Sequence, residues 1–431
     1  MRNAAVVKGP MKRGLGNRSI FQSERNSMNR SLSRRSFLTA AGFASLGLGA
    51  LYGQELNRIE GFEHLVEADR TKVWKMDTDR KIRVGLAGFG LCEFASQFYF
   101  QNHPNVEVVA VTDLFPDRCE GLAQKAKCGN KYPSLEEMVK DDNIEAVFVA
   151  TDAPSHADHV IAALKHGKHV ASAVPACWGS LEDADRLYEA VKETGLTYAM
   201  FETTAFRAGA YAARQLYGAG AFGKMIYTEG EYFHYGCGTL PGYKDWRRGL
   251  PPQWYPTHSN AFYTTVTGKG FTEVSCMGMP SILEEYQKGA NPYDNPFGTE
   301  IALFRTEEGG MARMGVSWDS CGAWGSETGR MRGEIAGFDG DNFQPQTDAA
   351  REKAASVDPS MPALPEGVEG GYHGGSHGPL MCDFIDALLR GRRPTVDIAM
   401  ALNLTVPGIV AHASALKDGE LMKIKRYEHL A

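Results

Sequence analysis

No two of the eight cysteines form a C-x-x-C pair; they are scattered from Cys92 to Cys382. This spacing gives no support to a metal cluster or a disulfide framework, although one incidental disulfide stays open as an alternative. No uncharged apolar run reaches the roughly 20 residues that a membrane-spanning helix needs, so we expect no stable membrane insertion. The 431 residues are 43% hydrophobic and 23% charged, which indicates a globular chain of two or three domains.

The first 54 residues hold nine basic side chains and one acidic one, so the rest of the chain carries a net charge of −14 rather than −6. A body this acidic is a poor partner for nucleic acid. Residues 33–38, Ser-Arg-Arg-Ser-Phe-Leu, lead into an uncharged run that extends to Leu51. This order resembles a twin-arginine export signal. We predict a signal peptide over residues 1–54, an arm over 55–80 and a periplasmic or otherwise exported protein; a disordered basic tail is the alternative.

An apolar strand over residues 82–87 is followed at once by Gly88 and Gly90. A helical stretch comes next, and then a second apolar run, 106–111, that leads to Asp113. This order of strand, glycine turn, helix, strand and acid is that of a dinucleotide site. A side chain at Gly88 would obstruct the tight turn, one at Gly90 would block the pyrophosphate, and the helix N-terminus would offer N–H groups to the phosphates.

Asp113 is expected to accept hydrogen bonds from the ribose hydroxyls and to repel a 2′-phosphate. The predicted cofactor is therefore NAD rather than NADP. The third glycine of the G-x-G-x-x-G pattern is replaced by Glu93, so an ordinary turn between strand and helix is the alternative.

Strands and helices alternate up to residue 200. We expect strands at 82–87, 106–111, 146–150, 169–173 and 197–199, with helices at 134–140 and 157–166. Beyond residue 205 we expect helices at 206–220, 381–389 and 399–416, strands at 224–235, 300–305, 312–318, 331–338 and 421–426, and a surface loop at 344–369. The predicted fold class is α/β: an N-terminal Rossmann doubly wound parallel sheet over residues 81–204, followed by a C-terminal α+β domain with a large, mostly antiparallel open sheet over 205–431.

Four side chains are candidates for contact with a substrate. Tyr255 and His258 are three residues apart in what reads as a short loop, and histidine titrates near neutral pH, which suits proton transfer. His373 and His377 stand in a glycine-rich turn, where backbone can approach a ligand closely. No carboxylate or cysteine completes a metal site there, so we predict no metal. Each of these residues also has a purely structural interpretation.

Glu202 ends a strand at the ligand edge of the predicted parallel sheet. It either binds substrate or anchors the junction of the two domains.

Three stretches, matched in order and spacing, resemble the Gfo/Idh/MocA oxidoreductase family: residues 146–151 with Pro154 and His156, residues 163–170, and residues 391–394 with Asp397. The resemblance implies a nucleotide-binding domain followed by a domain with a large sheet. That sheet would cover the nicotinamide and a substrate, a sugar or polyol. It would also form the subunit contact of a homo-oligomer, a dimer or a tetramer. The resemblance also implies that Pro175 is a cis-proline. The cofactor-binding residues that it adds are Thr151, Pro154, His156 and Pro175.

Most dehydrogenases of that family carry Glu-Lys-Pro, with a catalytic lysine, where this chain has Ala173-Val174-Pro175. Valine cannot transfer a proton. Val-Pro together with residues 255–258, Tyr-Pro-Thr-His, resembles glycoside hydrolase family 109, the NAD-dependent α-N-acetylgalactosaminidases. That resemblance implies that Tyr255 and His258 are catalytic. The subfamily usually has Glu at position 173 and often Tyr at the position of Phe206, so this chain departs from it twice.

We predict an NAD-dependent sugar or glycoside oxidoreductase that transfers a hydride at a sugar carbon, C3 by the resemblance. The alternatives are a redox-neutral NAD-dependent glycosidase, which oxidises, eliminates, hydrates and reduces, and a non-catalytic sugar sensor. An exported protein finds no NAD pool outside the inner membrane. We therefore expect the cofactor to load before export and to stay bound, with the arm at 55–80 closing over its adenosine side.

Overall fold

The computed structural model describes residues 74, 78–90, 92–321, 326–340 and 342–430. The predicted signal peptide and nearly all of the predicted arm lie outside these residues. Both stay predictions.

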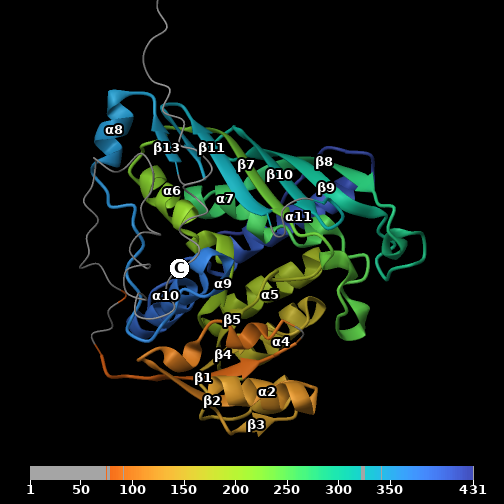
Figure 1. Cartoon of the computed structure of the whole chain (residues 1–431), viewed down its shortest axis with the longest axis vertical. Coiled ribbons are helices and arrows are strands. Elements are labelled where there is room, and N and C mark those ends of the chain that lie inside the picture. The colour runs from red at the N-terminus through yellow and green to blue at the C-terminus, as the bar shows by residue number, and fades with distance from the viewer. Residues whose placement is uncertain (1–73, 75–77, 91, 322–325, 341, 431) are drawn as a thin grey trace, which may run out of the picture. The chain divides into compact units, whose positions relative to one another are not determined.

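A six-stranded parallel sheet forms the N-terminal half, in the order β3-β2-β1-β4-β5-β6. Its strands are almost wholly apolar because helices cover both faces of such a sheet. The predicted doubly wound sheet is confirmed (Figure 1). The strands are β1 (Ile82–Ala87), β2 (Val106–Thr112), β3 (Lys131–Tyr132), β4 (Ala146–Val149), β5 (His169–Ser172) and β6 (Tyr198–Met200).

Within the described residues, four helices belong to this half. Ser134 and Ser180 cap two of them, because their side chains accept hydrogen bonds from the N–H groups of Glu137 and Asp183. The helices are α2 (Pro116–Ala126), α3 (Leu135–Met138), α4 (His156–Lys165) and α5 (Leu181–Thr194), of which α2 and α5 were not predicted.

The helix expected after the glycine turn does not form, so that prediction is wrong. Two short 3₁₀ turns replace it, η1 (Phe94–Ser96) and η2 (Phe100–Asn102), and Tyr99 between them has φ 54°. The cause is burial: Phe98 and Phe100 are 0% and 1% exposed. In an α-helix two side chains two residues apart point roughly 200° apart, whereas the observed turns place both rings in the same hydrophobic core.

The second sheet has eight strands in the order β13-β12-β11-β7-β10-β9-β8-β14. It is mostly antiparallel, as predicted, but β7 and β10 pair in parallel. The strand expected at 331–338 is instead the end of β11, a turn and β12. The strands are β7 (Met225–Phe233), β8 (Phe271–Pro280), β9 (Phe297–Thr306), β10 (Met311–Ser317), β11 (Ser326–Gly333), β12 (Ala336–Asp339), β13 (Asn342–Pro345) and β14 (Met422–Lys423).

Helices α7 and α11 pack on this sheet (Figure 1). Helix α11 is apolar over 18 residues, but 89% of that stretch is buried in the protein, as in a core helix. The surface loop expected at 344–369 contains a helix, α8, which Thr347 caps. The helices of this half are α6 (Ala208–Gly218), α7 (Thr257–Thr267), α8 (Asp348–Ala354), the short turn α9 (Tyr372–Gly375), α10 (His377–Arg390) and α11 (Ile398–Ala415).

The C-terminal segments return to the Rossmann half. The N–H of Met200 in β6 donates to the carbonyl of Val396 at 3.0 Å. The hydroxyl of Thr405 in α11 accepts from the N–H of Ala176 at 3.3 Å, and the Tyr427 hydroxyl donates to Asp185 in α5 at 2.6 Å. These contacts cross the boundary predicted at 204/205, which itself stays a prediction.

Candidate active site

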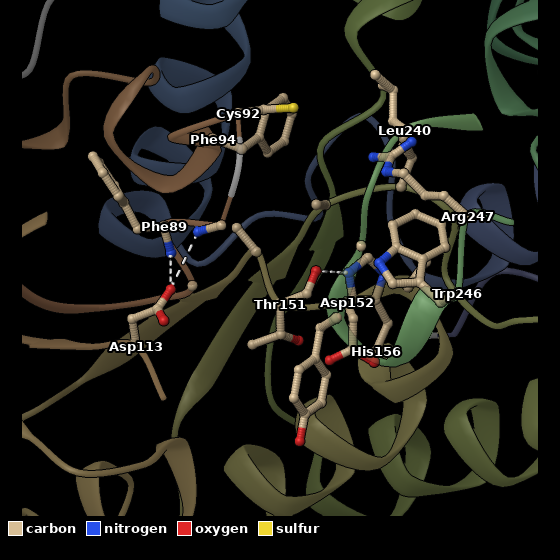
Figure 2. Close-up of a pocket in the computed structure, with 18 of the residues that line it drawn as sticks. Phe89, Cys92, Phe94, Asp113, Thr151, Asp152, His156, Leu240, Trp246 and Arg247 are labelled. Atoms are coloured by element: carbon tan, nitrogen blue, oxygen red, sulfur yellow. Dashed lines mark hydrogen bonds between the residues drawn. The ribbon is translucent and has the colours of Figure 1, made fainter. Parts of the chain in front are cut away.

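A cavity of about 560 Å³ lies where β1, β2, β4 and β5 end. Parallel sheets bind ligands beyond the carboxyl ends of their strands, so this is the place expected for a cofactor. One wall comes from the turns after those strands. The other comes from the second half of the chain, where Trp246 and Arg247 face the glycine turn across the cavity (Figure 2).

The glycine turn has the tightness that the sequence predicted at Gly88, and the role predicted for Gly90 at the pyrophosphate stays a prediction. Gly88 has φ +94°, and a Cβ there would lie 2.3 Å from the carbonyl oxygen of Ala150, so the turn has no room for a side chain. Gly90 has φ +60° and lines the cavity, and a Cβ there would meet nothing within 4 Å. The backbone at Gly90 is therefore open to a ligand.

Asp113 lines the cavity, but it also holds the turn together. Its Oδ2 accepts hydrogen bonds from the N–H groups of Phe89 at 2.8 Å and Gly90 at 3.2 Å (Figure 2), and its Oδ1 accepts one from Phe115 at 2.9 Å. The role predicted for Asp113 at the ribose stays a prediction.

The surroundings of Asp113 include residues that the sequence did not indicate. The ring of Tyr243, from the second half, lies 6.1 Å from that of Phe115. The Arg118 guanidinium lies over the Phe115 ring, 4.4 Å from its centroid, and Lys244 also lines the cavity.

His156 joins the turns after β4 and β5. Its Nδ1 lies 2.8 Å from the carbonyl oxygen of Pro175 and its Nε2 lies 3.2 Å from that of Thr151. Burial lowers the pKa of His156, which favours the neutral ring. Thr151 and His156 line the cavity, whereas Pro154 and Pro175 are not among the lining residues. The Val174–Pro175 peptide bond is cis, as the resemblance implied.

Tyr255 lines the cavity, and burial raises the pKa of its hydroxyl. His258 lies directly behind it, 3% exposed, with the two ring centroids 5.8 Å apart. It belongs to the first turn of α7 and not to a loop, so the loop expected there is wrong. Nearly every residue of α7 is buried, which removes the one-sided pattern by which a helix is found in a sequence.

Glu202 contacts His258 and is not among the residues that line the cavity. Its Oε1 accepts hydrogen bonds from His258 Nδ1 and from the N–H of Thr204, at 2.8 and 2.9 Å. Its Oε2 is buried and has no hydrogen-bond partner among the described residues. Burial alone would lower the pKa of His258, but Glu202 and, more weakly, Glu327 outweigh it and raise that pKa.

Glu327, on β11, is the member of the site that sequence reasoning missed. Its Oε2 accepts from Arg207 at 3.1 Å and from His373 Nδ1 at 3.3 Å, and its Oε1 accepts from the hydroxyl of Thr204. Burial alone would raise the pKa of Glu327. The nearby His373, His258 and Arg207 outweigh the effect of burial and lower this pKa to about 2. Strand alternation could have indicated it, because Glu327 and Met331 both point inward from β11.

The two histidines of the glycine-rich turn differ in position. His373 lines the cavity. His377 lies behind it: it is 0% exposed, its Nδ1 lies 3.1 Å from the carbonyl oxygen of Gln97, and its ring stacks on Phe98. Burial lowers the pKa of His377 to about 4. Of the two, His373 is therefore the one placed to meet a substrate.

Glu202, His258 and Glu327 also bring one oxygen or nitrogen atom each within 4.8 Å of one another. Such a grouping suits a divalent cation in size. The two carboxylates already contact Arg207 and His258, and the raised pKa of His258 favours its charged form, so ion pairing accounts for the cluster.

Residues 82–202 match the Gfo/Idh/MocA family, described as an oxidoreductase family with the NAD-binding Rossmann fold. The chain is similar to glycosyl hydrolase family 109 protein 1 of Bacteroides thetaiotaomicron, with 28% identity over 162 residues that cover 36% of this chain and 34% of that one. It therefore spans about a third of that relative's length. A glycosyl hydrolase family 109 protein of Saccharopolyspora erythraea is 23% identical over 66% of this chain and 67% of that one.

Among solved structures, levoglucosan dehydrogenase in complex with NADH and L-sorbose has a similar fold. The TM-score is 0.65 at 17% identity, over 81% of this chain and 100% of that one. The resemblance stated from the sequence is confirmed: residues 82–202 form an NAD-binding Rossmann domain, and the relatives include proteins named for glycosyl hydrolase family 109.

Proposed function

We propose, starting from the NAD-binding Rossmann domain of the Gfo/Idh/MocA family at residues 82–202, that this chain is an NAD-dependent sugar or glycoside oxidoreductase. One observation carries the proposal: the glycine turn and the pair Tyr255 and His373 line one cavity. A nucleotide held by the turn and proton-transfer groups placed at the far wall are the two components that alcohol oxidation needs.

The residues of the cavity fit NAD. The open backbone at Gly90 suits the pyrophosphate, and Asp113 and Thr151 offer oxygen atoms at the cavity wall. When bound, NAD⁺ supplies the acceptor for a hydride from a carbinol carbon, which we assign to C3 of a sugar. The chain itself binds the sugar hydroxyl and handles its proton through Tyr255 and the two histidines beside it, His258 and His373.

A second candidate, redox-neutral cleavage of a glycoside, is favoured by one position. Val174 lines the cavity where most dehydrogenases of the family place a lysine, and a valine side chain cannot relay a proton to solvent. The names of the relatives point the same way. Such a reaction leaves no net NADH, because the hydride returns to the same sugar.

One assay separates the two candidates. The purified chain is incubated with free sugars and with p-nitrophenyl glycosides, while NADH is followed at 340 nm and nitrophenol at 405 nm. Steady NADH, or reduction of an added acceptor, supports the oxidoreductase. Nitrophenol without net NADH supports glycoside cleavage. If neither signal appears with any probe, the proposed enzyme is contradicted and the sugar sensor is favoured.

A further inference from the structure

Two histidine rings stack at the wall of the cavity. His258, from α7, and His373, from the turn before α10, have ring centroids 5.8 Å apart and planes 17° apart. Each ring has its own carboxylate, since Nδ1 of His258 lies 2.8 Å from Glu202 and Nδ1 of His373 lies 3.3 Å from Glu327. The site therefore contains two similar carboxylate–histidine pairs, and the proposed function leaves open which of the two rings accepts the proton of the substrate hydroxyl.

The chain adopts an uncommon backbone conformation to place the second ring. His373 has φ 50° and ψ 48°, in the left-handed region, and its neighbours Gly371, Gly374 and Gly375 also have positive φ. The left-handed conformation is unfavourable for a residue other than glycine, and such residues cluster at functional sites. The result is a histidine that lines the cavity, with its side chain 30% exposed.

Glu327 fixes the orientation of this ring. Its side chain is 3% exposed, and the Arg207 guanidinium and the Thr204 hydroxyl hold it on two further sides. The low pKa of Glu327 keeps its carboxylate ionised. The carboxylate therefore accepts a hydrogen bond from the Nδ1–H group of His373. Nε2 is then the ring atom left for a substrate hydroxyl.

The charged groups around His258 and His373 determine which of the two rings is suited to accept a proton. His258 stands close to both carboxylates, which favour its protonated form, so it is poorly suited to accept another proton. His373 pairs with a carboxylate that it shares with Arg207. The titratable and charged groups facing His373 from the elements around it are Glu327, Arg207, His258, His234, Tyr255 and His377.

We propose that His373 is a second proton-transfer residue of this site, with Glu327 as its positioning residue. In the forward step the O–H bond of a sugar hydroxyl breaks and the proton moves to Nε2 of His373. The electron pair of the O–H bond forms the C=O bond, and the C–H pair leaves as hydride to NAD⁺, so the carbinol is oxidised and NAD⁺ is reduced. This rests on the proposed function.

The test compares His373→Asn, which tolerates the left-handed backbone, with Tyr372→Phe on the adjacent exposed side chain. NAD content and melting temperature are measured first and should match the wild type in both variants. The rate of NADH formation at 340 nm is then measured by stopped flow, with the free sugar or methyl glycoside that reacts fastest with the wild type. We expect His373→Asn to lose about 100-fold or more and Tyr372→Phe to keep the wild-type rate.

Two further variants distinguish chemistry from structure. In His373→Gly, which the left-handed backbone accepts, added imidazole should restore part of the lost rate. Glu327→Gln should lower kcat about 10-fold with little change in KM, because His373 then loses its positioning partner.

The outcomes are separable. If the wild type oxidises none of the sugars, the proposed function and this inference both fail. If the wild type is active and His373→Asn stays within twofold of it, this inference alone is overturned. A slow His373→Gly variant that imidazole does not rescue overturns it as well, because His373 would then only support the structure.

Discussion

Asp113 has two roles that one substitution removes together: it holds the glycine turn through the N–H groups of Phe89 and Gly90, and it places a negative charge at the cavity. Arg118 and Lys244 line the same cavity. We expect Asp113→Ala to weaken NAD binding roughly 10- to 100-fold, since each charge-assisted hydrogen bond contributes about 1.5–3 kcal/mol. Discrimination against NADP should fall, because two cations then meet the 2′-phosphate unopposed. Fluorescence titration with each nucleotide measures both effects.

Asp117→Ala, on the exposed surface of α2, is the matched control and should bind NAD like the wild type. An Asp113→Ala variant with the wild-type preference for NAD would show that Asp113 does not select the cofactor.

His258 makes the stability of the fold depend on pH. Its pKa in the folded protein is raised above the ordinary value of 6.5, so it contributes stability that is fully present below about pH 6.5 and is lost as pH rises through the folded pKa. Glu202→Gln removes the main cause of the raised pKa. We expect the wild type to lose melting temperature between pH 6 and pH 9, and Glu202→Gln to lose clearly less. Glu189→Gln, on the exposed face of α5, should keep the wild-type slope; equal slopes in all three proteins would refute the prediction.

Residues of the site could be predicted where a motif or a short spacing carries them. Gly88, Gly90 and Asp113 follow from the order of strand, turn and acid, and Tyr255 and His258 from one tetrapeptide. Glu327 and its partners Arg207 and His373 lie more than 45 residues apart along the chain. No local pattern relates such residues, because only the packing of β11 against η4 (Thr203–Phe206) and the turn before α10 brings them together.

Helix α7 can place His258 only because it lies very close to the sheet. A Cβ at Gly230 in β7 would stand 2.1 Å from the carbonyl oxygen of Ser259, the residue after His258. Gly230→Ala must therefore push α7 outward. We expect a loss of about 3 kcal/mol in the free energy of unfolding, measured with urea, since overpacking costs about 1–3 kcal/mol and here the obstacle is backbone. The rate should fall about 100-fold, because a shift of about 1 Å at a catalytic group has that effect.

Gly218→Ala, in α6, is the matched control for this substitution. A Cβ there meets nothing within 4 Å, so it should be neutral or stabilising by about 0.5–1 kcal/mol. If Gly230→Ala unfolds at the same urea concentration as Gly218→Ala, α7 does not depend on this close approach.

Elements with a clear period or composition were predictable from the sequence, such as β1, whose predicted bounds match the structure, and α11. Elements without a one-sided pattern were not. The region after the glycine turn was expected to be helical, but the need to bury Phe98 and Phe100 breaks the helix. The hairpin of β11 and β12 was read as one strand, since the turn between them contains no proline or glycine pair that would separate them.

For the chain as a whole, the export expected from its N-terminal residues is still a proposal. The structure of the cavity suggests how bound NAD would be retained during export. The segment that contains η5 (Cys237–Thr239) and η6 (Tyr243–Asp245) supplies Leu240, Tyr243 and Trp246 to the cavity wall opposite the Rossmann turns. We propose that this segment retains the cofactor. With association at about 10⁶ M⁻¹s⁻¹, a residence time of hours requires a Kd on the order of 0.1 nM.

We expect protein dialysed without NAD and then denatured to release about one nucleotide per chain, and to be active beforehand without added NAD. Tyr243→Ala should release NAD about 10-fold faster, because its ring no longer packs on Phe115. Tyr235→Ala, an exposed side chain of the same segment, is the control. A dialysed protein that contains no nucleotide and works only with millimolar NAD would end this proposal.

The return of the C-terminal segments to the Rossmann half also sets an order of events during synthesis. Strand β6 pairs with residue 396, Ala176 with residue 405, and Asp185 with residue 427, so the first half does not have all three partners until the ribosome has passed residue 427. The far wall of the nucleotide cavity likewise forms only after residues 232–255 and residue 373 have been synthesised. We therefore expect cofactor capture to be a late event of biogenesis, which follows the synthesis of both halves.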